Sequence, residues 1–235
     1  MQHLKQPFII KTFDVGPMQN LVYVISDTKT NYAAIVDPAW DLKEVYSYIN
    51  KNNLKLKNIL LTHSHNDHVN AIDEILLKFD LSIYLNHKEK IFWNKSYDNF
   101  EINYGGDIIK LGSTEIKSIH TPGHTPGSTC YQIGNNLIAG DTLFVFGCGR
   151  CDLHGGDPEE MFMTLKNLKS SLDEKTIILP GHDYSVKRSS TMNEQKSGNP
   201  FFHFDSLNKF VEYRMSLHDK IRNTPYDFIK KNGSH

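Results

Sequence analysis

The stretch LLTHSHNDHVNA, residues 60–71, contains three histidines and one aspartate within six positions: His63, His65, Asp67 and His68. The apolar run NILLT before it is typical of a buried strand, and NAIDEILLKF after it has the spacing of an amphipathic helix. The motif therefore lies on a strand-to-helix loop. Side chains two positions apart can converge on a loop, whereas on a helix they point about 200° apart. Because imidazole and carboxylate both bind zinc and iron well, the motif predicts a metal site with room for two ions.

Three later segments end an apolar strand near a glycine and then present another ligand-type side chain. They are IKSIHTPGHTPGS with His120 and His124, LIAGDTLF with Asp141, and IILPGHDY with His182. Strand ends that lie at one edge of a sheet bring such side chains together. We therefore expect these segments to complete the metal site.

The remaining chain alternates strand-like and helix-like segments. Strands are predicted at 8–15, 20–27, 32–38, 81–86, 107–111, 114–120, 129–134, 136–140 and 175–181, and helices at 41–53, 70–79 and 158–172. After about residue 190 the sequence becomes polar and loop-like, before a terminal helix over 204–223. This alternation predicts an α/β fold.

Composition limits the possible partners and the cellular location. The 235 residues carry 26 basic and 27 acidic side chains, so no overall charge attracts nucleic acid or a membrane surface. No apolar run approaches the roughly 20 residues of a membrane span, and the polar start MQHLKQ does not resemble a signal peptide. Three cysteines cannot all pair, which fits a reducing compartment. We expect a cytoplasmic protein.

The motifs together resemble the metallo-β-lactamase superfamily, and within it the glyoxalase II-like (hydroxyacylglutathione hydrolase-like) thioester hydrolases. The matching segments are VDPAW, THSHNDH, HTPGHTPGS, GDTLF, GCGRCDLHGGDPEEM and LPGHDY. The resemblance implies a four-layer αββα sandwich with the metals at one edge between two sheets. Residues 1–190 would form the catalytic domain, and residues 191–235 a short C-terminal helical extension packed on the core.

The resemblance also implies roles for single residues. Two divalent metal ions are expected, zinc first, with iron or manganese as alternatives. The first metal would be held by His63, His65 and His124, and the second by Asp67, His68 and His182, with Asp141 bridging them. Asp37 would organise the loops of the site, whereas His120 falls on a position that is not a ligand. Asp67 and Asp141 are the carboxylates assigned to the catalytic centre.

The thiol side of the site matches glyoxalase II only in part. Arg150 and Tyr184 correspond to residues that clamp glutathione, but Asp152 replaces an aromatic residue and no C-terminal basic pair is recognisable. We therefore predict a metal-dependent thioester hydrolase whose substrate is an S-acylglutathione-like thioester or an acyl group on a carrier protein or pantetheine. S-acylglutathione should bind weakly compared with a true glyoxalase II.

The expected chemistry needs no protein nucleophile. Two cations sharing one water lower its pKa from about 15.7 towards 7, which provides a metal-bridging hydroxide at neutral pH. Two other function classes stay open: a persulfide dioxygenase with mononuclear iron on His63, His124 and Asp141, and a non-catalytic binding module.

Several further residues have both a functional and a structural interpretation. Cys148 and Cys151 have the C-x-x-C spacing of redox proteins, but without a thioredoxin context packing is favoured. His154 would lie at the pocket mouth or on the plain surface. In NPFFHF, Phe201, Phe202 or His203 would face the ligand or pack the tail on the core.

Overall fold

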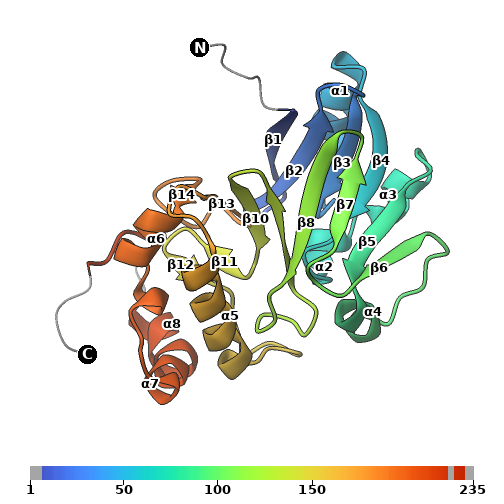
Figure 1. Ribbon diagram of the computed structural model, residues 1–235. Coiled ribbons are helices and arrows are strands. Elements are labelled where there is room, and N and C mark those ends of the chain that lie inside the picture. Colours follow the sequence, from blue (N-terminus) through green and yellow to red (C-terminus); the bar gives the residue numbers. More distant parts are fainter. Residues whose placement is uncertain (1–6, 222–224, 231–235) are drawn as a thin grey trace, which may run out of the picture.

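Two six-stranded β-sheets stack face to face in the computed structural model, which describes residues 7–221 and 225–230 (Figure 1). The first sheet has the order β1 (Phe8–Val15), β2 (Asn20–Asp27), β3 (Tyr32–Val36), β4 (Lys55–Leu60), β5 (Ser82–Asn86), β6 (Phe100–Asn103). The second has the order β14 (Ser190–Thr191), β13 (Ile177–Pro180), β10 (Asn136–Gly140), β9 (Thr129–Ile133), β8 (Thr114–His120), β7 (Ile108–Leu111). A small separate hairpin joins β11 (Leu143–Phe144) to β12 (Gly147–Cys148).

The direction of the strands places the predicted loops at one edge. Strands β3 to β6 are parallel, and so are β10 and β13, whereas the other neighbours in both sheets are antiparallel. Parallel strands have their carboxyl ends on the same side, and ligands typically bind there in open α/β sheets.

An apolar core fills the space between the sheets. It includes Tyr23, Ile25, Val36, Tyr131 and Ile138, none of which exposes more than 1% of its surface. A second apolar core lies between the first sheet and the helices outside it, and a third lies between the second sheet and its helices. Fully burying side chains of this size contributes about 1.5–3 kcal/mol each. Hydrophobic burial therefore holds four layers together.

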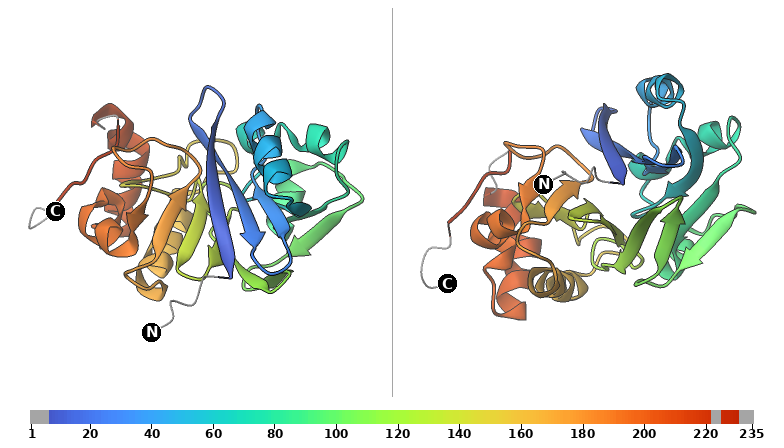
Figure 2. Two further views of the ribbon diagram at one scale, coloured as in Figure 1. Left: turned by 90° about the horizontal axis from the view of Figure 1, so that it is seen from above. Right: turned by 45° about the horizontal axis from the view of Figure 1, so that its top comes forward.

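Helices cover the outer face of each sheet (Figure 2). The first sheet is covered by α1 (Lys43–Lys51), α2 (Asn66–Val69), α3 (Ile72–Leu76) and α4 (His87–Trp93), and the second by α5 (Pro158–Ser171), α6 (Met192–Gly198), the 3₁₀ turn η1 (Pro200–Phe202), α7 (Leu207–Glu212), the π-helical turn η2 (Tyr213–Leu217) and α8 (His218–Ile221). The predicted four-layer αββα sandwich is confirmed.

Some predicted elements differ from those in the structure. The metal motif is not wholly a loop, because Asp67 and His68 lie in the short helix α2, and the helix predicted over 70–79 is only α3. The segment after residue 190 was predicted to be loop-like, which is wrong: Thr191 and Glu194 form a capping box that starts α6. Helix α4 and strand β6 were not predicted. Residues 222–223 of the predicted terminal helix lie outside the described residues.

Described residues between 192 and 213 pack on the second sheet. Met192, Phe201, Phe202 and Phe210 are buried in the same core as Leu165 of α5. In the described part of the chain, no helix has the length and apolarity needed to span a membrane.

Candidate metal centre

All seven predicted metal ligands lie at one edge of the two stacked sheets. His63 follows β4, His124 follows β8, Asp141 follows β10 and His182 follows β13. His65 is the N-cap residue of α2, and the backbone N–H of His68 donates to the His65 carbonyl at 2.9 Å. This single helical turn carries Asp67 and His68, and it brings the His68 ring to 4.1 Å from the His63 ring, measured between centroids.

The imidazoles of the first predicted set converge. His65 Nδ1 lies 2.9 Å from His124 Nε2. The ring centroid of His63 lies 4.9 Å from that of His65 and 4.8 Å from that of His124. One potential ligand atom from each of the three histidines lies within 4.8 Å of the others.

The second predicted set converges in the same way. His68 Nε2 lies 3.2 Å from His182 Nε2, and Asp67 Oδ2 lies 3.5 Å from His68 Nε2 and 3.4 Å from His182 Nε2. These three atoms have the spacing of ligands that share one ion.

Asp141 lies between the two sets. One of its oxygens is 3.4 Å from His68 Nε2, and the other is 3.6 Å from His124 Nε2 and 3.4 Å from His182 Nε2. A β-carbon added at Gly181 would collide with Asp141 Oδ1, so the close approach of the β13 loop requires glycine there. This central position is what a bridging carboxylate needs.

Two observations indicate that the donor atoms suit metal ions: their spacing, and the absence of a hydrogen-bond partner for two of them. His63 Nε2 and Asp141 Oδ1 are buried without a hydrogen-bond partner. Leaving such a group unpaired costs about 1–3 kcal/mol, which a bound cation would remove. Two imidazole nitrogens on one tetrahedral zinc lie about 3.3 Å apart, close to the 2.9 Å and 3.2 Å observed here.

The electrostatics of the two sets differ. Burial lowers the pKa of His65 to about 4, with a further contribution from His124, and burial also lowers the pKa values of His63 and His124. Burial alone would lower the pKa of His68 too, but Asp141 and Asp37 outweigh it and raise that pKa to about 9. The first set therefore offers neutral imidazoles at pH 7, whereas a cation at the second set would displace a proton.

Asp37 orients the site without belonging to either set. Its carboxylate accepts hydrogen bonds from the backbone N–H of Thr62 at 2.7 Å and the Thr62 hydroxyl at 2.5 Å. It also lies 3.1 Å from His68 Nδ1, which fixes the ring so that Nε2 points at Asp67 and Asp141. Although Asp37 lies near His63 and His68 in a possible ligand cluster, these bonds already use its oxygens.

Two residues that sequence reasoning missed hold the ligands from behind. Asn20, at the start of β2, donates from Nδ2 to Asp67 Oδ2 at 2.9 Å and accepts at Oδ1 from Trp40 Nε1, also at 2.9 Å. Its position at a strand start gave no signal, because the sequence does not show that β2 runs antiparallel to β3 and so begins at the ligand edge.

Glu89 is the second missed residue, and it connects both loops that carry the first set. This fully buried carboxylate on α4 accepts from the backbone N–H and hydroxyl of Ser64 at 2.7 and 2.6 Å. It also accepts from the Thr125 hydroxyl at 2.7 Å and the Gly127 backbone N–H at 3.0 Å. Ser64 lies between His63 and His65, and Thr125 follows His124, so Glu89 sets the distance between the loops.

Backbone carbonyls orient two more ligands. His124 Nδ1 lies 2.7 Å from the Arg150 carbonyl oxygen, and His182 Nδ1 lies 2.8 Å from the Met18 carbonyl oxygen. If Nδ1 carries the proton in each ring, Nε2 presents its lone pair to a metal ion.

A pocket of about 480 Å³ opens above the ligands. Besides metal ligands, it is lined by Met18, Gln19, Phe144, Cys148, Arg150, Leu153, Tyr184 and Tyr226. Arg150 and Tyr184, the two residues predicted to bind substrate, both line this pocket. However, the Arg150 guanidinium makes a two-pronged ion pair with Asp152, at 2.9 and 2.6 Å. The aspartate that replaces the expected aromatic residue therefore engages the only basic side chain, histidines aside, among the described residues that line this pocket.

Other residues highlighted in the sequence have structural roles. His120 Nε2 lies 2.9 Å from the Pro126 carbonyl oxygen, and His154 is exposed and stacks on Phe92 at 5.4 Å. Leu153, not His154, lines the pocket. Burial raises the pKa of Cys148, and that of Cys151 to about 12, which opposes redox reactivity of the pair.

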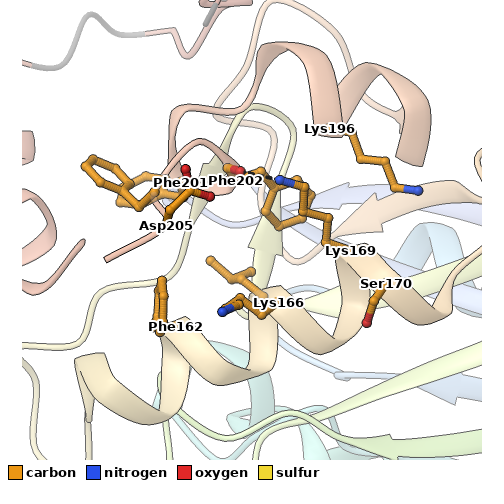
Figure 3. Close-up of a pocket in the computed structure, with 10 residues that line it drawn as sticks. Phe162, Lys166, Lys169, Ser170, Lys196, Phe201, Phe202 and Asp205 are labelled. Carbon is orange, nitrogen blue, oxygen red and sulfur yellow. Dashed lines mark hydrogen bonds between the residues drawn. The ribbon is translucent and has the colours of Figure 1, made fainter. Parts of the chain in front are cut away.

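Phe201 and Phe202 do not face the metals. They are buried beside α5 and form part of a separate cavity of about 400 Å³ with Phe162 and Lys169 (Figure 3). Lys169 donates to the Phe202 carbonyl at 2.7 Å across this cavity. Aromatic packing of the tail on the core is therefore their role in the fold.

Comparisons with known proteins agree with this geometry. A model of the metallo-beta-lactamase superfamily matches residues 15–182. The probable polyketide biosynthesis zinc-dependent hydrolase PksB of Bacillus subtilis is 31% identical over 216 residues, covering 89% of this chain and 96% of that protein. The probable hydroxyacylglutathione hydrolase glo2 of Schizosaccharomyces pombe is 31% identical over 209 residues, covering 84% of this chain and 75% of that protein.

A solved structure shows the same similarity in three dimensions. The crystal structure of ETHE1 from Myxococcus xanthus superposes with a TM-score of 0.78 at 26% identity, covering 89% of this chain and 91% of that one. Residues 15–182, which the superfamily model matches, contain every predicted metal ligand, from His63 to His182. The chain therefore belongs to the metallo-β-lactamase superfamily, whose members are typically metal-dependent hydrolases.

Proposed function

We propose that this protein hydrolyses an acyl thioester with two divalent metal ions, zinc being the expected metal and iron or manganese the alternatives. The observation that carries the proposal is the convergence of two three-residue ligand sets on Asp141 at the floor of one pocket. His63, His65 and His124 would hold the first ion, and Asp67, His68 and His182 the second. Bound cations would supply a hydroxide nucleophile at neutral pH and polarise the substrate carbonyl.

The protein's own residues position and shield this chemistry. Asp37 and Asn20 fix His68 and Asp67, and the carbonyls of Arg150 and Met18 fix His124 and His182. A thiol leaving group, with a pKa of about 8.5, departs as thiolate without a dedicated acid. The pocket accordingly needs no protein nucleophile, and the buried Cys148 that lines it has a raised pKa.

The names of two relatives support parts of this proposal. Hydroxyacylglutathione is a thioester of a small thiol, and glo2 is named as a probable hydrolase of it. PksB is named as a probable polyketide biosynthesis zinc-dependent hydrolase, which supports metal-dependent hydrolysis with zinc. Because Asp152 already binds Arg150, we favour an acyl group on pantetheine or a carrier protein over S-acylglutathione.

The test compares kcat/KM for an acyl carrier protein, the matching acyl-pantetheine and S-lactoylglutathione, with wild type and Arg150→Ala. We expect metal-dependent cleavage, with S-lactoylglutathione the poorest substrate. The Arg150 guanidinium is about half exposed and already paired with Asp152, so an anion that replaces Asp152 would gain only about 0.2–1 kcal/mol, and Arg150→Ala should lower kcat/KM for the acyl carrier protein, whose arm carries a phosphate, by up to about fivefold. A strong preference for S-lactoylglutathione that survives Arg150→Ala would refute both the preference and the role of Arg150.

A persulfide dioxygenase is the second candidate, with one iron on His63, His124 and Asp141. The likeness to ETHE1 supports it, as does the 3.6 Å distance between His124 Nε2 and Asp141 Oδ2. Sulfite formation from glutathione persulfide and oxygen, without any thioester cleavage, would favour this candidate. One metal per chain in saturating zinc, manganese or iron would point the same way.

A further inference from the structure

The described C-terminal segment, residues 225–230, contributes an aromatic side chain to the metal pocket. Tyr226 lines the pocket together with Phe144 and Tyr184, and its ring centroid lies 6.4 Å from each of theirs. We call these three residues the aromatic wall. The wall stands directly beside a predicted metal ligand, since the Tyr184 ring stacks on His182 at 4.6 Å with an interplanar angle of 10°.

Backbone contacts hold Tyr226 in this position. Its N–H donates to the Tyr184 carbonyl at 2.7 Å, and its own carbonyl accepts from the N–H of Val186 at 3.0 Å and the hydroxyl of Ser185 at 2.7 Å. On the other side, a β-carbon added at Gly147 would lie 2.7 Å from the Tyr226 ring. The ring therefore packs directly against the backbone of β12 and is only 6% exposed.

The chemistry of the pocket lining indicates what the aromatic wall accepts. Outside the metal ligands, the other described lining residues are uncharged except Arg150, whose guanidinium is bound by Asp152. Glutathione would bring two carboxylates and an ammonium group into this pocket, and burying unpaired charges is costly. A pantetheine arm near the sulfur is a chain of alkyl groups and amides, which packs on aromatic faces without that cost.

We propose that Tyr226 is a specificity-determining residue: its ring, with Phe144 and Tyr184, packs against an uncharged pantetheine-type thiol arm and selects it over glutathione. The catalytic side of this inference rests on the proposed thioester hydrolysis, but the binding side does not. The role belongs to the ring, so Tyr226→Phe should keep it and Tyr226→Ala should lose it.

The first test measures binding without turnover. Two thioethers with the same S-hexyl group, one on pantetheine and one on glutathione, are titrated calorimetrically into metal-free and zinc-loaded protein. We expect S-hexylpantetheine to bind about tenfold more weakly to Tyr226→Ala, with Tyr226→Phe within about twofold of wild type. The affinity for S-hexylglutathione should stay unchanged, so the selectivity itself falls.

Two further variants separate this role from general damage. Phe228→Ala removes an aromatic side chain from the same segment that contacts Phe146 and does not line the pocket, and it should leave both affinities unchanged. Gly147→Ala pushes the Tyr226 ring from the opposite side and should reduce selectivity in the same direction. Equal weakening of both thioethers in Tyr226→Ala, or no change in either, would overturn the inference.

Kinetics then distinguish this inference from the proposed function. If wild type cleaves thioesters but Tyr226→Ala keeps the wild-type ratio of kcat/KM between acyl-pantetheine and S-acylglutathione, the inference about Tyr226 fails alone. If no thioester is cleaved while S-hexylpantetheine binding still depends on the Tyr226 ring, the proposed reaction fails and the binding inference stands.

Discussion

Replacing Glu89 by glutamine should loosen the first metal set, although Glu89 touches no metal ligand. One carboxylate oxygen accepts both donors of Ser64, and the other accepts from Thr125 and the Gly127 backbone N–H. An amide has only one oxygen. Whichever way the substituted side chain turns, its NH₂ group must face a backbone N–H, either that of Ser64 or that of Gly127.

The size of the effect follows from this donor-to-donor contact. Each buried group left unsatisfied costs about 1–3 kcal/mol, and two groups are affected. Part of that cost is offset, because burial raises the pKa of Glu89 and its charged form is itself expensive to bury. We expect Glu89→Gln to lower the free energy of unfolding by about 2 kcal/mol, measured by urea denaturation.

The effect on metal binding should be specific to one set. Mutation of a residue that orients metal ligands typically lowers metal affinity about 10- to 100-fold. We expect Glu89→Gln to lower the affinity for the ion at His63, His65 and His124 by about that factor. A chelator-competition titration should resolve one weakened and one nearly unchanged site. Glu74→Gln is the matched control: this exposed carboxylate pairs with Lys78, and such pairs contribute about 0.2–1 kcal/mol. Wild-type stability and metal affinity in Glu89→Gln would refute the reasoning.

Three other predictions rest on Asp141, on the two cysteines near the pocket and on the buried Asp27. Asp141→Ala should reduce the content of both metals more than any single histidine change, which elemental analysis checks, because Asp141 contacts both sets. Cys148→Ala and Cys151→Ala should keep metal-dependent turnover and metal content, and loss of turnover in a folded, metal-loaded variant would reopen a covalent mechanism. Burial alone would raise the pKa of Asp27, but hydrogen bonds from Ser113, Thr30 and Thr114 lower it. The ionised Asp27 carboxylate therefore contributes fully to the free energy of unfolding above the unfolded-state pKa of about 3.9, and this contribution is lost as the pH falls towards the pKa in the folded state. Lowering the pH should thus reduce the free energy of unfolding of wild type more than that of Asp27→Asn, which urea denaturation at several pH values checks.

The ligands could be predicted from the sequence because they occur in four short motifs, each of which begins at or just after the end of a strand. His63, Asp141 and His182 lie within three residues of the ends of β4, β10 and β13, which led us to expect them at one edge, and the resemblance to the superfamily then assigned the ligands to two metals. The α/β class followed from the same strands and from their alternation with helices such as α1 and α5, whereas the four-layer sandwich followed from the resemblance to the superfamily. These are short-range signals, and a single sequence contains them.

Among the residues around the ligands, Asp37 was expected from the resemblance to the superfamily, whereas Asn20, Glu89 and Tyr226 could not be predicted, because their roles depend on contacts across the fold. Glu89 lies on a helix that the sequence pattern did not predict, and it reaches Thr125 from 36 residues away. Tyr226 lies 41 residues from Ser185 and reaches the pocket only because the C-terminal segment returns to the β13 loop.

If the inference about Tyr226 holds, choice of the thiol arm depends in part on residues outside the region that carries the metal ligands. The ligand set uses strand ends between β4 and β13, which matches the region shared with the superfamily, residues 15–182. Tyr184 and Tyr226 lie beyond that region, and both face the pocket beside His182. If the inference about Tyr226 holds, relatives with the same seven ligands but a different C-terminal segment should bind metals alike and differ in the thiol arm they accept. Exchanging residues 225–230 between two such proteins should then transfer selectivity for the arm without changing metal content.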